Sequence, residues 1–228
     1  MVDQDSAPST AACADACVQL GVELRSGPAG LLPVDPGWRV IGPARPVIHL
    51  GSVDVFLEAC QHLRPGDVLV VDDGGRTDRA CVGDLTALEV KGAGGTGMVV
   101  WGCHRDSTQL LEVGLPVFSL GARPPGPVTV EPAAAGAAPR LAEHPVEPGD
   151  MVVGDADGVV LLPGDRGEEI LEAAAEIVGV ESAQAADVRD GRSLRAQLDF
   201  DAYLEARRRD PSYSFREHLR RRGGAIER

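Results

Sequence analysis

The feature that most constrains the fold is a turn-and-strand unit that occurs twice in the chain. Pro65-Gly66-Asp67 leads into the apolar run Val68-Leu69-Val70-Val71, and Pro148-Gly149-Asp150 leads into Met151-Val152-Val153. An acidic turn that contains glycine follows each run. A Pro-Gly-Asp turn is an ordinary tight turn before a strand and needs no functional explanation. Two such units indicate two β-rich halves around one core, and they argue against a doubly wound dinucleotide-binding sheet.

Helical and extended segments alternate around these units. Residues 10–20 and 53–62 have apolar positions at helical spacing, whereas residues 38–44 and 47–50 are typical of short strands separated by a turn. Residues 124–142 are rich in proline, alanine and glycine, so we expect an exposed loop there. The pattern predicts a mixed α/β domain.

The last quarter of the chain has a different character. Asp165 and Glu168 have the spacing of a capping box for a helix that carries Ile170, Ala173, Ala174 and Ile177. The composition changes near residue 186, so we expect an α/β domain over residues 1–185 and a C-terminal helical extension over residues 186–228. This extension is rich in arginine on an otherwise acidic chain. Docking on a neighbouring subunit and a solvated helical surface explain that charge equally well.

Composition excludes several classes of function. The chain has 228 residues, enough for one full core, and a formal net charge of −13, which argues against a broad nucleic-acid-binding face. Its apolar runs are too short to span a bilayer, and no leader pattern is present, so we expect no membrane association. Five cysteines without a CxxC pair predict buried free thiols in a reducing cytoplasm.

A glycine-rich stretch over residues 92–97 satisfies the pattern GxGxxG. A dinucleotide site requires a strand before these glycines and a helix after them. In this chain the order is reversed, because a helical segment over residues 85–91 precedes them and the strand 98–101 follows. The glycines are therefore expected to end a helix and turn the chain, and no nucleotide site is predicted.

Two carboxylates and one guanidinium lie near the ends of neighbouring elements. Asp84 opens a helix after Gly83, and Arg105-Asp106 follow a strand that ends near Gly102. Two acids can hold a hard divalent cation with its waters, and an arginine can grip a carboxylate with two hydrogen bonds. The free N–H groups of a first helical turn also favour an anion. Such a set suits a small α-keto acid.

Each of these residues also has a purely structural interpretation. Asp84 can cap its helix, Asp106 with Gln109 has the spacing of a capping box, and Arg105 can form a structural salt bridge. His104 is a candidate proton shuttle because histidine titrates near neutral pH, although a lone histidine in a turn is more often structural. Spacing alone leaves these alternatives open.

The order of the motifs resembles the family of class II pyruvate aldolases and regulator of ribonuclease activity A proteins. The resemblance rests on Asp84, Arg105 and Asp106, which are spaced as D-x20-R-D, and it extends over PGDVLVVDDGG, ACVGDLTALEV, GMVVWGCHRD, GLPVFSLG and PGDMVVGDADGVVLLP. It implies a fold like the swivelling β/β/α domain, an αββα-like sandwich. It also implies homo-oligomers, either trimers or hexamers, with sites near the subunit contacts.

The resemblance further implies a chemistry: retro-aldol cleavage of substrates like 4-hydroxy-4-methyl-2-oxoglutarate to pyruvate, and decarboxylation of oxaloacetate. By this resemblance Asp106 would bind Mg²⁺ or Mn²⁺, Asp84 would orient a metal-bound water, and Arg105 would hold the carboxylate of the oxo acid. The substrate site would be completed by Gly83 and the backbone N–H groups of Leu85 and Thr86.

Two departures from the family pattern leave alternatives. Trp101 stands where many members carry aspartate, and His104 precedes the arginine, so the substrate can differ from those named. In the aldolases an acid from a neighbouring subunit often completes the site, and the candidates here are Glu205, Glu217 and Glu227. We therefore also consider a repurposed biosynthetic lyase, and a non-catalytic regulator that binds a ribonuclease.

Overall fold

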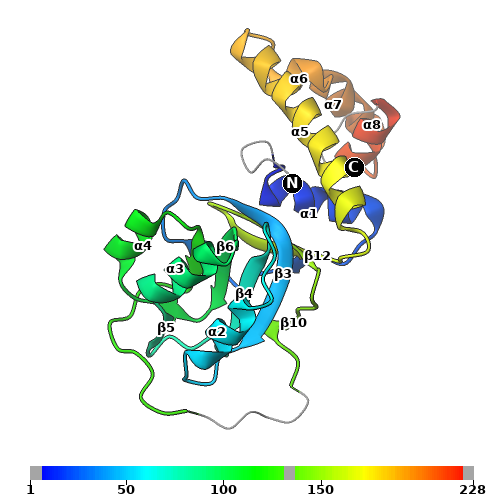
Figure 1. Ribbon diagram of the computed structural model, residues 1–228. Helices are drawn as coiled ribbons and strands as arrows, with labels where there is room; N and C mark the ends of the chain where they lie inside the picture. Colours follow the sequence, from blue (N-terminus) through cyan, green and yellow to red (C-terminus); the bar gives the residue numbers. More distant parts are fainter. Residues whose placement is uncertain (1–6, 131–136, 223–228) are drawn as a thin grey trace.

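An eight-stranded mixed sheet forms the centre of the protein, shown in Figure 1 as a computed structural model that describes residues 7–130 and 137–222. Its strands lie in the order β1-β12-β11-β3-β4-β6-β8-β2. Their bounds are β1 (Arg25–Ser26), β2 (Leu32–Pro33), β3 (Val40–Ile48), β4 (Val68–Asp72), β6 (Gly97–Trp101), β8 (Val117–Ser119), β11 (Met151–Asp155) and β12 (Gly158–Leu162). Two short pairs are also present: β5 (Ala80–Val82) with β7 (Cys103–His104), and β9 (Arg140–Leu141) with β10 (His144–Pro145).

The two strands that follow a Pro-Gly-Asp turn, β4 and β11, lie on either side of β3. The two predicted β-rich halves therefore join in one sheet at this strand. Strands β3, β4, β6 and β8 run parallel, whereas β11 pairs antiparallel with both β3 and β12. The carboxyl ends of the parallel strands meet at one edge, where side chains from different strands can come together.

The aspartates of both Pro-Gly-Asp turns have structural roles, as the sequence indicated. Asp67 accepts hydrogen bonds from the Arg45 side chain at 2.6 Å and from the backbone N–H of Arg64 at 2.9 Å. Asp150 pairs with Arg25 through two hydrogen bonds of 2.9 and 3.0 Å. Both aspartates are buried, so each turn is fixed by a carboxylate that an arginine neutralises.

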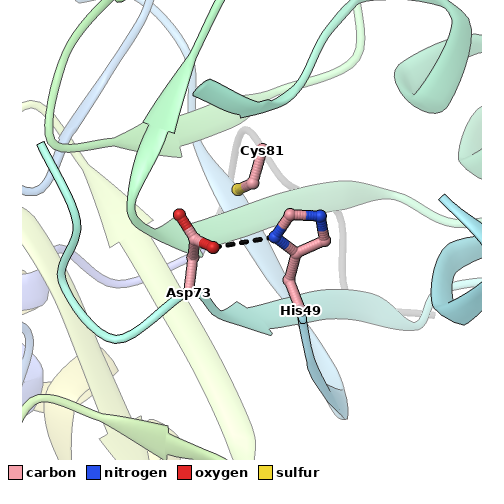
Figure 2. Close-up of side chains that lie close together, drawn as sticks. All are labelled: His49, Asp73 and Cys81. Atoms are coloured by element: carbon pink, nitrogen blue, oxygen red, sulfur yellow. Dashed lines mark hydrogen bonds and ion pairs between the residues drawn. The ribbon is translucent and has the colours of Figure 1, made fainter. Parts of the chain in front are cut away.

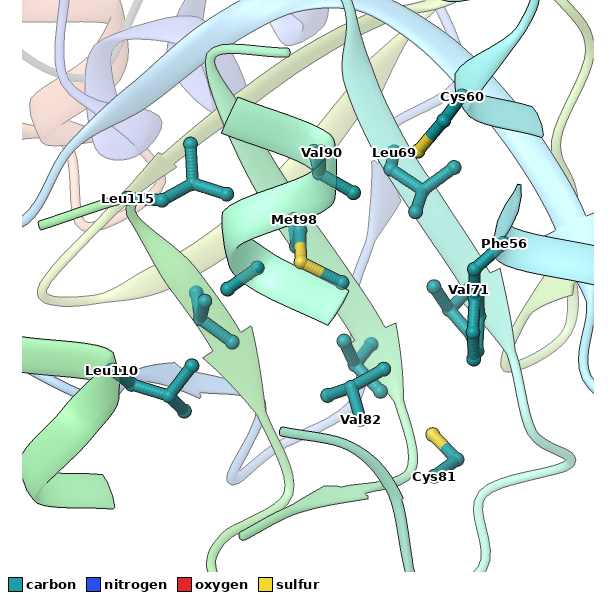
Figure 3. Packing of buried hydrophobic residues seen from close by; sticks show 13 residues of the cluster. Phe56, Cys60, Leu69, Val71, Cys81, Val82, Val90, Met98, Leu110 and Leu115 are labelled. Atoms are coloured by element: carbon teal, nitrogen blue, oxygen red, sulfur yellow. The ribbon is translucent and has the colours of Figure 1, made fainter. Parts of the chain in front are cut away.

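Helices cover the sheet in separate layers (Figure 1). Their bounds are α1 (Thr10–Leu20), α2 (Asp54–Cys60), α3 (Asp84–Gly92), α4 (Ser107–Val113), α5 (Gly167–Arg189), α6 (Leu194–Gln197), α7 (Phe200–Arg209) and α8 (Phe215–Arg222). Helices α2, α3 and α4 bury Phe56, Val90 and Leu110 against the parallel strands, around Met98 (Figure 3). Helices α1 and α5 pack on β11 and β12. The predicted α/β fold is confirmed.

Two predictions about local structure need correction. The two short strands expected over residues 38–50 are one strand, β3, which contains Pro43 and Pro46. It stays continuous because it pairs with β11 through its first half and with β4 through its second half. The capping box of Asp165 with Glu168 is wrong, since the N-cap of α5 is Arg166, which makes no side-chain cap hydrogen bond. Arg166 instead pairs with Glu169 at 2.7 Å.

The C-terminal helices project away from the sheet (Figure 1). Helix α5 continues without a break through residue 186, and α6, α7 and α8 fold back beside it. An aromatic cluster holds α7 and α8 together, with Tyr203 in contact with Phe200, Phe215 and His218. The helical character predicted for residues 186–228 is thus seen up to residue 222, while the division into two domains and the docking on a subunit stay predictions.

All five cysteines are free and buried, as predicted from their spacing. Burial raises the pKa of Cys13 to about 12, with Cys17 and Asp155 acting in the same direction, so this thiol stays protonated at neutral pH. Within the described ranges, no helix is long and apolar enough to cross a membrane.

Candidate functional site

The small β5–β7 pair builds the candidate site. These strands run parallel, with Ala80 opposite Cys103 and Val82 opposite His104. The residues that follow each strand, Gly83-Asp84 and Arg105-Asp106, therefore lie side by side. The backbone N–H of Arg105 donates to the Val82 carbonyl at 3.0 Å and fixes this arrangement.

A cavity of about 190 Å³ opens between these residues. Six of the seven site residues predicted from the sequence line it: Gly83, Asp84, Leu85, Thr86, Arg105 and Asp106. Its wall also includes Pro127, from a loop whose contribution the sequence did not reveal. The predicted constellation is therefore one site in space.

The Asp106 carboxylate makes no cap hydrogen bond to α4, the helix that Asp106 precedes. The residue is the N-cap of α4 in the left-handed conformation, with φ 60° and ψ 41°. The predicted capping box with Gln109 is therefore wrong. The carboxylate lies over Gly83 instead, where a Cβ atom would approach Asp106 Oδ2 to 2.5 Å. A side chain at position 83 would push this carboxylate away from its place.

Arg105 brings a positive charge to the same place. Its Nε lies 3.4 Å from Asp106 Oδ2, and half of its side chain is exposed. On the other side the guanidinium lies beside Gly126, where a Cβ would stand 2.8 Å from Nη1. The arginine therefore lies between the acid and the loop that carries Pro127, and it can accept a second carboxylate from a ligand.

Asp84 is the first residue of α3, and the N-cap is Gly83, so the interpretation of Asp84 as an N-cap is wrong. Its Oδ1 accepts a hydrogen bond from the backbone N–H of Leu85 at 2.8 Å. Of the two backbone N–H groups expected to bind substrate, that of Leu85 is therefore already hydrogen-bonded to Asp84. Thr86, whose amide is the other, lines the cavity beside it.

His104, the seventh predicted site residue, and Trp101 lie outside the lining of this cavity. The His104 ring is buried between two serines, with Nδ1 2.6 Å from Ser119 Oγ and Nε2 2.9 Å from Ser107 Oγ. Burial lowers the pKa of His104, so the ring is neutral and bonded at both nitrogens. The indole of Trp101 packs against Gly75.

A second cluster, not singled out from the sequence, forms another part of the cavity wall (Figure 2). It contains His49, Asp73 and Cys81, whose possible ligand atoms lie within 4.8 Å of one another. His49 Nδ1 lies 2.7 Å from Asp73 Oδ1, and both side chains are only 1% exposed. His49 and Cys81 line the cavity. His49 directly follows β3 and Asp73 directly follows β4, so the pairing of these two strands brings the side chains together, and that pairing cannot be read from the local sequence.

The Cys81 thiol is protonated in this cluster. Burial raises its pKa well above the usual value, and the nearby Asp73 carboxylate raises it further. Its Sγ is 3.7 Å from the carbonyl of Cys103, to which the thiol donates. A neutral buried thiol is a poor nucleophile.

Two of the three glutamates considered as contributions to a neighbouring subunit's site, Glu205 and Glu217, are paired with arginines of their own helices. Glu205 accepts hydrogen bonds from Arg208 at 3.2 Å and Arg209 at 2.8 Å, and Glu217 accepts one from Arg221 at 2.6 Å. Glu227 lies outside the described residues. A role for any of them in a partner's site stays a prediction.

The fold and the cavity together define an αββα-like α/β protein with two acids and an arginine at the ends of a short parallel strand pair. The chain belongs to the RraA-like family (Aldolase/RraA), whose model matches residues 10–161.

Three similar proteins illustrate the range of this family. A relative from Halalkalibacterium halodurans, named "Putative 4-hydroxy-4-methyl-2-oxoglutarate aldolase", is 31% identical over 176 residues, which cover 73% of this chain and 80% of that protein. A protein of the same name from Shewanella oneidensis is 34% identical over 96 residues, 42% of this chain and 58% of that protein. The structure of Streptomyces coelicolor RraAS2, described as an unusual member of the RNase ES inhibitor RraA protein family, matches with a TM-score of 0.68 and 32% identity over 78% of this chain and 92% of that one.

Proposed function

We propose that this protein is a divalent-metal-dependent carbon–carbon lyase that releases pyruvate from a 4-hydroxy-2-oxo acid, decarboxylates oxaloacetate, or does both. The observation that carries the proposal is the convergence of Asp84, Arg105 and Asp106 on one cavity. At about 190 Å³ the cavity is smaller than the ~300–1,000 Å³ typical of sites for drug-sized ligands. That size favours a small acid, and relatives named as aldolases support the same substrate class.

Asp106 and Asp84 fit a hard divalent cation. The Asp106 carboxylate is turned away from its helix and lies over Gly83, which leaves its oxygens available in the cavity. Carboxylate oxygens and waters are the ligands that Mg²⁺ and Mn²⁺ prefer, so Asp106 would hold the ion and Asp84 one of its waters. When bound, the cation would supply Lewis-acid polarisation of the substrate's keto group. The nitrogen and sulfur donors of His49 and Cys81 suit a softer metal, so we do not propose them as ligands of this cation.

The chain's own residues then have distinct tasks. Arg105 binds the carboxylate next to the keto group, and the amide at the start of α3 adds a hydrogen bond from Thr86. In a 4-hydroxy-2-oxo acid the hydroxyl proton at C4 passes to water, the C4–O bond becomes a carbonyl, the bond between C3 and C4 breaks, and its electron pair forms the C2–C3 double bond of the enolate. In oxaloacetate, cleavage of the bond between C3 and C4 releases carbon dioxide and leaves the same enolate. Negative charge develops on the oxygen at C2, where the Arg105 guanidinium can stabilise it.

The test is a pyruvate-release assay over several 4-hydroxy-2-oxo acids and oxaloacetate, with Mg²⁺, with Mn²⁺ and with excess chelator. We expect activity only with metal, and a loss of at least about 100-fold in Arg105→Ala and in Asp106→Asn, because each removes a group that stabilises the transition state. His62→Asn is the control, since His62 is exposed and lies outside the cavity. Full activity in chelator or in either variant would contradict the mechanism.

A second candidate is a protein-binding regulator of a ribonuclease. The likeness to Streptomyces coelicolor RraAS2, a member of an RNase ES inhibitor family, favours it, and the net charge of −13 would suit a basic partner surface. Binding of the purified chain to RNase ES, measured by calorimetry, would support this function if no oxo acid is cleaved. Absence of binding together with lyase activity would exclude it.

A further inference from the structure

His49 and Asp73 form a fixed pair in the wall of the candidate site. They follow β3 and β4, neighbouring parallel strands in which Ile48 stands opposite Asp72. The backbone N–H of His49 donates to the Asp72 carbonyl at 2.8 Å, and the side chains meet at 2.7 Å. The imidazole also stacks on Phe56, with ring centroids 5.2 Å apart and an angle of 8° between the planes. The ring is therefore held by backbone, carboxylate and aromatic contacts.

This arrangement leaves one ring nitrogen for a ligand. Nδ1 is engaged by Asp73, and a carboxylate at that position favours the tautomer with hydrogen on Nδ1. Figure 2 shows Nε2 turned away from Asp73, and no hydrogen-bond partner for Nε2 is found among the described residues. Because His49 lines the same cavity as Asp84 and Arg105, a ligand there can meet this nitrogen.

The Asp73 carboxylate is buried with one oxygen unpaired among the described residues, an arrangement that by itself destabilises the folded state. Its Oδ2 is buried and has no hydrogen-bond partner within the described part of the chain. A buried, partly unsatisfied carboxylate destabilises the fold unless a positive charge offsets it. A proton added at Nε2 of His49 would make the ring positively charged, with Nδ1 2.7 Å from this carboxylate, and the two opposite charges attract each other.

We propose that His49 is the residue that delivers a proton to C3 of the enolate left by carbon–carbon cleavage, with Asp73 as its positioning residue. This inference rests on the proposed lyase function. The donor is the ring with a proton on both nitrogens: its Nε2–H bond breaks and leaves the electron pair on nitrogen, the electron pair between C2 and C3 forms a new C3–H bond, and the oxygen at C2 returns to a keto group. The neutral imidazole then recovers a proton from solvent, which has received the hydroxyl proton of the substrate. In reverse, His49 removes a methyl proton from pyruvate.

The reverse step gives the test. In heavy water, the wild-type protein with Mg²⁺ or Mn²⁺ is expected to exchange the methyl protons of pyruvate, which proton NMR follows directly. His49→Asn and His49→Gln should lower this exchange at least about 100-fold, the size expected for loss of a general acid, while oxo-acid consumption falls less than about tenfold. Imidazole added to His49→Ala should restore part of the exchange. His62→Asn is the matched control.

Asp73→Asn tests the positioning role. We expect exchange to fall about tenfold, less than in the His49 variants, because the imidazole remains but its orientation and charge support are weakened. The nitrogen chemical shifts of His49 should move toward the other tautomer, a change that a merely structural role would not produce.

The measurements distinguish a failure of the His49 inference from a failure of the lyase proposal. Equal losses of exchange and consumption in the His49 variants, or undiminished exchange, would overturn this inference and leave the lyase proposal standing. No pyruvate release from any oxo acid by the wild-type protein would overturn both.

Discussion

At the scale of single residues, Gly83 decides whether the two acidic segments can share a site. Its backbone is extended, so any residue could adopt its conformation, and the restriction comes from space. A Cβ there would stand 2.5 Å from Asp106 Oδ2 and 3.4 Å from Arg105 Cγ. The side-chain oxygen would have to move away from the cavity. The glycine is therefore tied to the position of the proposed metal ligand.

Gly83→Ala is predicted to lower pyruvate release more than about tenfold, since displacement of a catalytic group by a fraction of an ångström to one ångström has effects of that order or larger. Affinity for Mn²⁺, measured by calorimetry, should fall with it. Gly92→Ala is the matched control, because Gly92 is the last residue of α3, the helix that Gly83 precedes as N-cap, and a Cβ at Gly92 meets nothing within 4 Å. Equal activity in the two variants would contradict this account of Gly83.

His104 provides a residue-scale prediction about pH. Burial lowers its pKa in the folded state, while the unfolded chain has the ordinary histidine value of about 6.5. The unfolded state therefore binds more protons between the two pKa values, and the contribution of His104 to stability is lost as pH falls below about 6.5. Denaturant unfolding of wild type and His104→Asn between neutral and mildly acidic pH should show a shallower pH dependence for the variant. An unchanged slope would show that His104 is equally solvated in both states.

At the scale of elements, patterns with a repeated period were predictable and contacts between distant segments were not. The apolar spacing over residues 10–20 predicted the bounds of α1, and the predicted order of a helix before the glycines of residues 92–97 and a strand after them is confirmed by α3 and β6. Strand β3 was divided in two because prolines argue against a strand, and its change of partner is a tertiary property. Both predicted capping boxes are wrong, because Asp106 takes the left-handed conformation at the start of α4 without a side-chain cap hydrogen bond, and Arg166 is the N-cap of α5.

At the candidate site, too, residues in local motifs were predictable from the sequence and residues brought in by distant contacts were not. Motif order predicted Gly83, Asp84, Arg105 and Asp106, since two short segments of a known pattern carry them. The His49 contribution depends on the pairing of β3 with β4, and that pairing has no local signature in the sequence. Pro127 reaches the cavity through a long loop whose path only the folded structure gives.

An element-scale prediction concerns the turn that leads into β4. Asp67 is buried, and its carboxylate accepts hydrogen bonds from the Arg45 side chain and from the backbone N–H of Arg64. Asp67→Ala removes both bonds and should lower the free energy of unfolding by about 1–3 kcal/mol, as expected for a buried group left without its partner. Asp15→Ala, at an exposed position of α1, is the control and should change stability little. Denaturant titration measures both, and a loss no larger than the control would rule out this role.

At the scale of the whole molecule, the helical extension lies outside the part that defines the family. The family model ends at residue 161, whereas α5 begins at Gly167. Arginines gather in the last turns of α7 and α8, and the whole chain has a net charge of −13. An acidic body and a basic extension are electrostatically complementary between copies, which favours the predicted homo-oligomer over a solvated tail.

The last prediction tests that complementarity by reversing charge. Arg216 and Arg220 are both exposed on the last helix, α8. The double variant Arg216→Glu with Arg220→Glu should therefore fold but assemble less well if the extension docks on an acidic neighbour. Arg64→Glu, an exposed arginine near the turn into β4, carries the same change of sign away from the extension and is the control. Analytical ultracentrifugation should show a smaller mass for the double variant only, and high salt should shift the wild type in the same direction, because exposed charge pairs are screened beyond about 10 Å at moderate ionic strength. An identical mass for all three proteins at every salt concentration would mean that the extension packs only on its own chain.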